Sequence, residues 1–381
     1  MSVDLRPIRA FLSTSHFALL EKAEAFGRDV LTRRRPPDDD AAARVEARIL
    51  LKQMGDAGLF EPIRARDYRG CCLMRESLSF YSPLADSVFA LQALGATPLL
   101  LGGTPLQVAL AHEAIAGDEM AAFAMTEPEA GSDAHGISCE AKRDGDFYIL
   151  SGTKTLISNG GLADFYVVFA TVDPTRPKSI TAFFVDAATV GLEFVRPLIL
   201  SAPHPLGEIA FHDCRISEAS RIGKEGDGLK LALSTLDRLR ATVGAAACGM
   251  AARALADAIA HAQTRHQFGK PLAEFQLIQD KIARMAIRLR AARLLVYEAA
   301  WEKDQGMERV TLESGMAKAF ATENAQTIID DAVQILGGKG VMKDSMVDLL
   351  YRSVRALRIY EGTTEIQHLL IASLLLKAPA R

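Results

Sequence analysis

The 381-residue sequence is poor in several features that mark specialised classes of protein. Aromatic residues make up only 7% of it, with a single Trp, so an extended base-stacking surface is not expected. The formal net charge of -3 offers no basic excess that would attract phosphate backbones or anionic membranes. We therefore expect neither a nucleic-acid partner nor a membrane partner.

Cysteine and histidine patterns are lacking too. The five cysteines are scattered, odd in number and without a CxxC pair, which argues against a disulfide framework or a zinc knuckle. They are interpreted as small buried residues. Among the eight histidines no HExxH motif occurs, and we predict no metal.

No long apolar run stands out near the middle of the chain. Residues 241–252 form an uncharged stretch rich in Ala and Gly, much shorter than the roughly 20 residues of a membrane-spanning helix. This stretch predicts close packing between helices. Residues 1–26 lack the basic start and the unbroken apolar run of a signal peptide, so a cytoplasmic location is expected.

The local texture of the chain changes twice. Residues 1–117 follow a helical pattern, interrupted by a charged segment at 33–40 that predicts a solvated loop. Residues 118–222 carry Gly and Pro between short β-branched and aromatic runs, which predicts a β domain. The helical period of 3.6 returns over residues 223–381. The expected domains are therefore helical, β and helical, with these boundaries.

Strands within the β domain are expected at 147–150, 165–169 and 180–185. The Asp-Gly-Asp run at 144–146 predicts a turn before the first strand, and Ser151-Gly152 is expected to close that strand.

Helices of the last domain can be predicted from their faces and ends. One helix is expected to end at Gly337-Gly338, because Gly accepts the left-handed conformation of a helix terminus. Thr364 to Gln367 match a capping box that would open a last helix. An earlier amphipathic helix is expected to bury the face formed by Ile278, Ile282, Met285, Leu289, Ala292 and Val296.

Four segments carry more specific patterns. They read AMTEPEAGSD at 124–133, GTKTLISNG at 152–160, RHQFGKPL at 265–272 followed by Phe275-Gln276, and QILGGKG at 334–340 paired with RIYEGTTEIQ at 358–367. Taken together and in this order, they closely resemble the FAD-dependent acyl-CoA dehydrogenase family. The resemblance implies an α+β multidomain fold: an N-terminal helical domain, a middle antiparallel β-barrel-like domain and a C-terminal four-helix-bundle domain.

The resemblance also implies an activity. Members of the family remove a proton α to an acyl-CoA thioester carbonyl while a hydride leaves the β carbon for flavin N5, giving trans-2-enoyl-CoA, as in fatty acid metabolism. Glu361 matches the family's base. Burial against substrate and flavin would raise the pKa of its carboxyl group and make it a useful base. An electron-transfer flavoprotein is the implied electron acceptor, and a homotetramer the implied assembly.

The same matches imply residues for FAD. Thr126 and Ser132 are expected at the isoalloxazine edge or the thioester, and the Ser158 hydroxyl near flavin N5. Arg265 suits a pyrophosphate through its planar donor fork, and in the family it reaches the FAD of a neighbouring subunit. The full set expected to bind FAD is Phe123, Met125, Thr126, Gly131, Ser132, Leu156, Ile157, Ser158, Arg265, Gln267, Phe268, Gln276, Gln334, Ile335, Gly337, Gly338, Thr363 and Glu365.

The residues expected to bind the substrate are Ser132, Asp237, Leu239, Arg240, Tyr360 and Gly362. Arg240 resembles the family's pocket-lining Arg. Leu239 stands where some branches of the family carry the base, and a leucine cannot take a proton.

Several departures from the family pattern bear on the substrate. Leu156 replaces a usual Trp, so the outer edge of the flavin is expected to be less shielded. His368 and Ser373 replace two usual Arg residues, which leaves open whether CoA or a carrier protein holds the acyl group. The Tyr-Arg-Gly run at 68–70 replaces Tyr-Gly-Gly, and chain length is not predicted. Two further hypotheses are a flavin-dependent oxygenase on the same fold and a non-catalytic helical scaffold.

Overall fold

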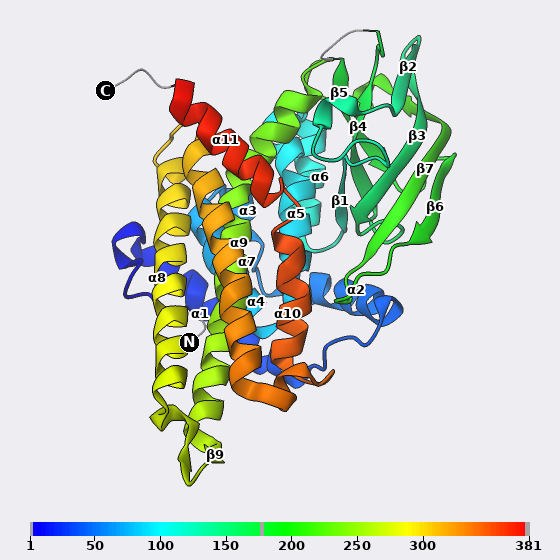
Figure 1. Cartoon of the computed structure of the whole chain (residues 1–381). Helices are drawn as coiled ribbons and strands as arrows, with labels where there is room; N and C mark the ends of the chain where they lie inside the picture. Colours follow the sequence, from blue (N-terminus) through cyan, green and yellow to red (C-terminus); the bar gives the residue numbers. More distant parts are fainter. Residues whose placement is uncertain (1–2, 176–178, 378–381) are drawn as a thin grey trace. The chain divides into compact units, whose positions relative to one another are not determined.

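A computed structural model describes residues 3–175 and 179–377 (Figure 1). The chain forms two compact units, each built from segments that are distant in the sequence. Unit 1 comprises Met1–Arg35, Asp67–Asp86 and Asp237–Arg381, and unit 2 comprises Pro36–Arg66 and Ser87–Leu236. Helices α5 (Pro83–Gly102) and α7 (Gly228–Thr264) contribute residues to both units.

Unit 1 is helical, and its long C-terminal helices run along one another (Figure 1). Besides parts of α5 and α7 its main elements are α1 (Thr14–Asp29), α4 (Tyr68–Tyr81), the short strands β9 (His266–Gln267) and β10 (Lys270–Pro271), α8 (Gln276–Asp304), α9 (Thr311–Leu336), α10 (Met346–Leu357) and α11 (Thr364–Lys377). Short 3-10 turns lie at Arg9–Phe11, Leu31–Arg33, Leu272–Glu274 and Gly337–Val341.

The predicted faces of these helices are largely confirmed. On α8 the side chains of Met285, Leu289, Ala292 and Val296 are buried, whereas the two isoleucines nearer its start are half-buried. All of residues 241–252 on α7 are buried. The close packing predicted for this stretch is visible where the Ser79 hydroxyl of α4 donates to the backbone carbonyl of Ala246, at 2.9 Å.

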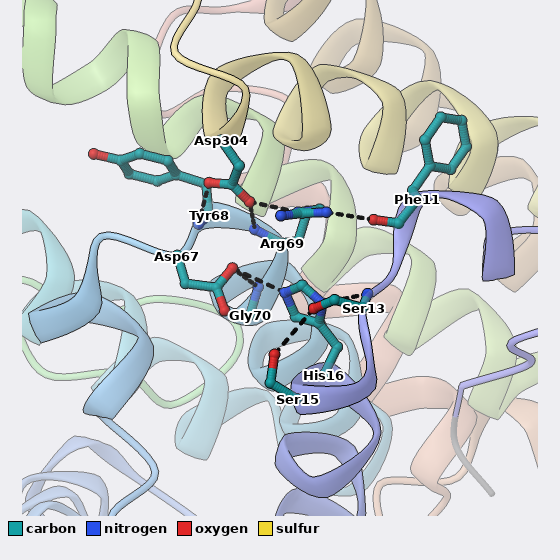
Figure 2. A network of polar contacts seen from close by, with 9 residues as sticks. All are labelled: Phe11, Ser13, Ser15, His16, Asp67, Tyr68, Arg69, Gly70 and Asp304. Carbon is teal, nitrogen blue, oxygen red and sulfur yellow. Dashed lines mark hydrogen bonds and ion pairs between the residues drawn. The ribbon is translucent and has the colours of Figure 1, made fainter.

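A polar network ties the N-terminal segment, α4 and α8 of unit 1 together (Figure 2). Asp304, the last residue of α8, accepts from the backbone N–H groups of Tyr68 and Arg69 and from the Arg69 guanidinium. Arg69 also donates to the carbonyl of Phe11. His16, which is buried, bonds Asp67 at the start of α4. Arg69, which departs from the family pattern, therefore supports the fold here.

The helix boundaries follow the predicted signals with one correction. In unit 2, α2 (Asp40–Asp56) begins at the last residue of the predicted loop, with Asp39 accepting from Ala42 N–H at 2.8 Å. Helix α9 ends at Gly337, whose φ is +60°. The capping residue of α11 is Thr363 rather than Thr364. Its hydroxyl oxygen accepts from Ile366 N–H, because the Thr364 hydroxyl is engaged by Glu323.

Unit 2 is built around an eight-stranded sheet. Its strands are β1 (Ala121–Ala124), β2 (Glu140–Asp144), β3 (Phe147–Ser158), β4 (Phe165–Thr171), β5 (Ile180–Asp186), β6 (Leu192–Pro197), β7 (Leu206–Ser217) and β8 (Arg221–Ile222). The order is β6-β7-β3-β2-β4-β5-β8, with β1 pairing β4. The other main elements of the unit are α2, α3 (Glu61–Ala65), α6 (Pro105–Ala116) and 3-10 turns at Ala134–Gly136 and Glu218–Ser220.

The predicted α+β class is confirmed, whereas the sheet is mixed rather than wholly antiparallel. The pairs β1/β4 and β2/β4 are parallel. The chain reverses between β2 and β3, which are antiparallel, and reverses again before β4, so that β4 runs in the same direction as β1 and β2. The three predicted strands lie inside β3, β4 and β5, and Gly145 makes the predicted turn with φ +59°.

The predicted end of β3 at Gly152 is wrong. The strand continues to Ser158, and Gly152, with φ +142°, lies beside a bulge in β7, where His212 and Asp213 together oppose Ser151. A Cβ atom at this position would lie 2.9 Å from the Cα of Cys139, so the glycine permits a close approach of two strands rather than a turn.

Two helices, α5 and α7, are long and apolar enough to cross a membrane by length and composition alone. The windows that meet this criterion are 78% and 61% buried inside the protein. Burial of this kind accounts for their apolar composition, as in other core helices. The five cysteines are all buried, which confirms their interpretation as small core residues.

Candidate active site

In unit 2 the first motif segment is held by a buried ion pair. Lys154 Nζ lies 2.7 Å from Glu127 Oε1 and also donates to the carbonyl of Met125 at 3.1 Å. Glu127 accepts from the backbone N–H groups of Ser138 and Cys139 as well. Burial raises the pKa of Glu127, but Lys154 and these donors outweigh it and hold the pKa below its ordinary value. The ion pair therefore fixes the backbone on either side of Thr126.

The hydroxyl groups on this loop are free to bind a ligand. The side chains of Thr126 and Ser132 have no hydrogen-bond partner within the described residues, and Ser132 is exposed. An added Cβ at Gly131 would meet no atom within 4 Å. Phe123 is half-buried and packs on Phe169 with ring centroids 4.7 Å apart.

A bulge in β3 lies at the GTKTLISNG segment. Thr155 and Leu156 together oppose one residue, Glu208, of β7. Leu156 adopts φ +55°, an unusual conformation for a non-glycine residue, and its side chain is 56% exposed. Ile157 is buried, and Ser158 is half-buried. Bulges of this kind re-aim strands beside functional sites.

In unit 1 the Glu361 backbone is strained. Its φ is +55° and that of Gly362 is +91°. Two side chains hold this conformation: Lys318 of α9 donates to the Gly362 carbonyl at 2.7 Å, and the Gln367 amide of α11 donates to the carbonyls of Glu361 and Gly362. A strained position fixed from two helices is typical of a functional site.

The Glu361 carboxyl group is enclosed and surrounded by charge. Its Oε2 atom is buried and has no hydrogen-bond partner within the described residues. Burial raises the pKa of Glu361 above its ordinary value, while the positive charges of Arg75, Arg240 and Lys318 lower it. Burial also lowers the pKa of Lys318 to about 8.

Arg75 and Arg240 differ in how their charge is compensated. Arg75, fully buried on α4, makes two hydrogen bonds to Asp86, at 2.8 and 3.0 Å, and one to Thr242 at 3.0 Å. Arg240 Nε and Nη1 are buried and unpartnered in the described chain, and the closest carboxylate atom, on Asp237, is 3.9 Å away. Buried donors without partners are costly. Arg240 is therefore the cation that a ligand can still bind.

A third group of predicted FAD residues lies at the other end of α9. Gln334 is near the C-terminus of this helix, whereas Lys318 beside Gly362 is near its start. The rise of 1.5 Å per residue separates them by about 24 Å. Arg265 and Gln334 are exposed, and their side chains have no hydrogen-bond or ion-pair partner within the described residues. Phe268, between β9 and β10, is 93% exposed.

The remaining predicted residues divide by exposure. Thr363 caps α11, and Glu365 in its first turn is exposed. Leu239 and Ile335 are buried, so Ile335 could reach a cofactor only through its backbone. The other exposed residues among those predicted to bind FAD or substrate are Gln267, Gln276, Gly337 and Gly338, together with Tyr360, which is 39% exposed.

Four residues of these clusters have no role in the sequence-based prediction: Arg75, Asp86, Lys318 and His204. His204 Nε2 lies 2.8 Å from the Ser158 hydroxyl. Of these four residues, only Lys318 could have been suspected from the sequence, because it is a charged residue between two alanines, Ala317 and Ala319, on the buried face of a helix.

Two sets of these residues fit a flavin dinucleotide: the loop hydroxyls of Thr126 and Ser132 in unit 2, and Arg265 in unit 1. Unpartnered hydroxyls in unit 2 suit the polar edge of an isoalloxazine ring, and the unpaired guanidinium of Arg265 suits a pyrophosphate. Among the described residues no group of three or more His, Cys, Asp or Glu side chains is arranged to hold a metal ion.

Comparisons with known proteins agree with this chemistry. Residues 122–214 match the model of the acyl-CoA dehydrogenase middle domain, and residues 226–376 match that of the C-terminal domain. The 3-(aryl)acrylate reductase of Clostridium sporogenes is 38% identical over 340 residues, covering 86% of this chain and 90% of that protein. Subunit CarC of the caffeyl-CoA reductase-Etf complex of Acetobacterium woodii is 40% identical over 294 residues, covering 75% of this chain and 76% of the relative.

Among solved structures, butyryl-CoA dehydrogenase from Megasphaera elsdenii superposes with a TM-score of 0.88 at 32% identity, covering 96% of this chain and 99% of the other. Family models, relatives and fold thus coincide over the helical and sheet parts alike. The chain belongs to the acyl-CoA dehydrogenase family, whose members are FAD-binding oxidoreductases.

Proposed function

We propose that the protein removes the α and β hydrogens of an acyl-CoA thioester to give the trans-2-enoyl product, with Glu361 as the base that takes the α proton. One observation carries the proposal. The Glu361 carboxyl group has an enclosed, unpartnered oxygen on a backbone strained at φ +55°, beside three cationic side chains. The reaction needs a carboxylate that is ionised yet poorly solvated, and this surrounding supplies one.

Residues of this chain would perform each proton and binding step. Glu361 Oε2 accepts the α proton, while Lys318 and Gln367 hold the backbone beneath it. Arg240 offers unpaired donors to a polar group of the ligand. Bound FAD supplies the hydride acceptor. Thr126, Ser132 and Ser158 would hold its polar edge, and Arg265 with Gln334 a pyrophosphate.

We further propose a homotetramer in which these pyrophosphate residues serve the FAD of a neighbouring subunit. The separation of about 24 Å along α9 between Gln334 and the Glu361 loop supports this assignment. Exposed apolar side chains on α8, Leu277 and Ile287, supply a surface for association. A cytoplasmic location stays a prediction from the sequence.

The relatives suggest a second candidate function, reduction of an α,β-unsaturated thioester or acid. Two of them are named as reductases of aryl acrylates and caffeyl-CoA. The same residues would serve this direction, with Glu361 returning the proton. One relative belongs to an Etf complex, which supports an electron-transfer flavoprotein as the redox partner.

Anaerobic flavin bleaching tests the proposal. The wild-type protein reconstituted with FAD should bleach with a saturated acyl-CoA, and the dithionite-reduced protein should recolour with an enoyl-CoA. Glu361→Gln should keep its flavin and bleach about 1,000-fold more slowly, because the amide cannot take a proton. Normal bleaching by this variant would place the base elsewhere.

Substrate and electron-acceptor controls distinguish the candidate functions from one another. Acyl-CoAs of several lengths and one acyl carrier protein thioester identify the carrier. NADH-dependent hydroxylation without an enoyl product would support an oxygenase instead. A protein that takes up no FAD would be a scaffold.

A further inference from the structure

Ser158 ends β3, and its hydroxyl lies 2.8 Å from Nε2 of His204, in the segment that leads into β7. The two segments are joined at this point, because Ser158 pairs with Leu206 in the sheet. The other ring nitrogen of His204, Nδ1, is buried and has no hydrogen-bond partner within the described residues.

Asp40, at the start of α2, acts on His204 through its charge and also has an unpaired buried atom. Its Oδ1 atom is buried and unpartnered, while Oδ2 accepts from Arg44 Nε at 2.7 Å. Arg44 in turn donates to the carbonyls of Gly160 and Leu206, on either side of the Ser158–His204 contact. In the described part of unit 2, Asp40 Oδ1 and His204 Nδ1 are the only buried side-chain polar atoms left without a partner.

The two unpaired atoms make no direct hydrogen bond to each other. A carboxylate oxygen can only accept, and a bridging water that accepts from Nδ1–H and donates to Asp40 Oδ1 would satisfy both atoms, with the hydrogen of the ring on Nδ1. Burial lowers the pKa of His204 to about 4, although Asp40 raises it, so the ring is neutral at pH 7. Nε2 then holds a lone pair and accepts from the Ser158 hydroxyl.

We propose that His204, oriented by Asp40, turns the Ser158 hydroxyl hydrogen away from the flavin, so that Ser158 presents only lone pairs to flavin N5 and favours the reduced cofactor, which carries hydrogen there. His204 is thus a positioning residue that acts through Ser158. The inference rests on the proposed function, in which Ser158 meets the N5 region.

The reduction potential of the bound flavin tests this role. His204→Leu removes the acceptor, and we expect the equilibrium between reduced and oxidised flavin to shift about tenfold toward oxidised, which is a fall of about 30 mV for a two-electron couple. His204→Gln keeps an acceptor oxygen and should restore most of the potential. Asp40→Asn should lower it in the same direction as His204→Leu.

A double-mutant cycle isolates the route through Ser158. In a Ser158→Ala background, His204→Leu should change the potential no further. Equal shifts for His204→Leu and His204→Gln, or a shift that persists without Ser158, would show a merely structural role and overturn the proposal. Thermal unfolding of each variant confirms that it is folded.

Failure of this proposal can be told from failure of the proposed function. Wild-type protein that binds FAD and is bleached by acyl-CoA, but whose potential is unchanged by His204→Leu, refutes the role of His204 alone. A protein that takes up no FAD refutes both.

Discussion

At the scale of single residues, the charge around Glu361 is the feature with the widest consequences. Burial and the three neighbouring cations act on the carboxyl group in opposite directions, and burial is the largest influence. Arg75 makes two hydrogen bonds to Asp86, whereas Arg240 has only a loose ion pair with Asp237 at 3.9 Å. An anionic ligand group bound to Arg240 would offset its positive charge and raise the proton affinity of Glu361 further.

The pH dependence of flavin reduction should report this balance. Because the Glu361 pKa is raised and the base must be ionised, the rate at saturating substrate should rise with pH through a midpoint above the ordinary value of 4.5. Arg240→Leu removes one cation and should move the midpoint upward. Stopped-flow bleaching over a pH series measures it. A midpoint at or below 4.5, or one that falls in Arg240→Leu, would contradict the assignment.

At the scale of elements, the sequence predicts helices and strands well where the signal is local. The turn at Gly145, the end of α9 at Gly337 and the buried face of α8 depend on nearby residues, and all three are confirmed. Gly152 misleads because the same residue type serves a turn and a bulge. Only tertiary contacts, the pairing with β7 and the close approach of Cys139, decide between them.

The candidate site is predictable only in part for the same reason. Motif matches supplied Glu361 and Ser158, whereas Arg75, Asp86 and His204 reach the clusters through tertiary contacts. Arg75 and Asp86 lie on different helices, and no local pattern links them. His204, in the segment before β7, bonds Ser158 at the end of β3.

The packing of α7 against α4 gives a prediction at this scale. A Cβ atom at Gly249 would lie 2.0 Å from the backbone oxygen of Glu76, whereas one at Gly315 on α9 would meet nothing closer than 3.4 Å. Gly249→Ala should therefore cost about 1–3 kcal/mol of unfolding free energy by overpacking. Gly315→Ala should be neutral or gain up to about 1 kcal/mol from helix propensity.

Urea unfolding followed by circular dichroism compares the two variants. If Gly249→Ala lowered the unfolding free energy no more than Gly315→Ala, the contact between α7 and α4 would tolerate a methyl group at Gly249, against the prediction.

At the scale of the whole molecule, apolar side chains remain exposed on α8. Ile287 and Leu294, one heptad apart, lie on the same side of the helix and are 67% and 39% exposed. Leu277 is 80% exposed near the start of the helix. In a helix that also buries an apolar face within unit 1, a second apolar side indicates association between subunits.

If the proposed homotetramer forms through this side of α8, light scattering on the purified protein should show the mass of four chains. Ile287→Glu should dissociate it, because a charge would be buried at the interface. Val190→Glu, on an 89% exposed valine of a unit 2 loop, is the matched control and should leave the assembly intact. Dissociation by both variants, or by neither, would place the interface elsewhere.

In the proposed homotetramer, damage at the two ends of α9 would have different consequences in a cell that makes both a damaged and an intact chain. Lys318 at one end supports the base of its own subunit, and Gln334 at the other would contribute to a neighbour's cofactor site. A chain damaged near Gln334 or Arg265 would therefore weaken an intact neighbour, whereas a chain damaged at Glu361 would silence only itself. Lesions of the first kind should behave as partly dominant when both chains are made in one cell, and lesions of the second kind as recessive.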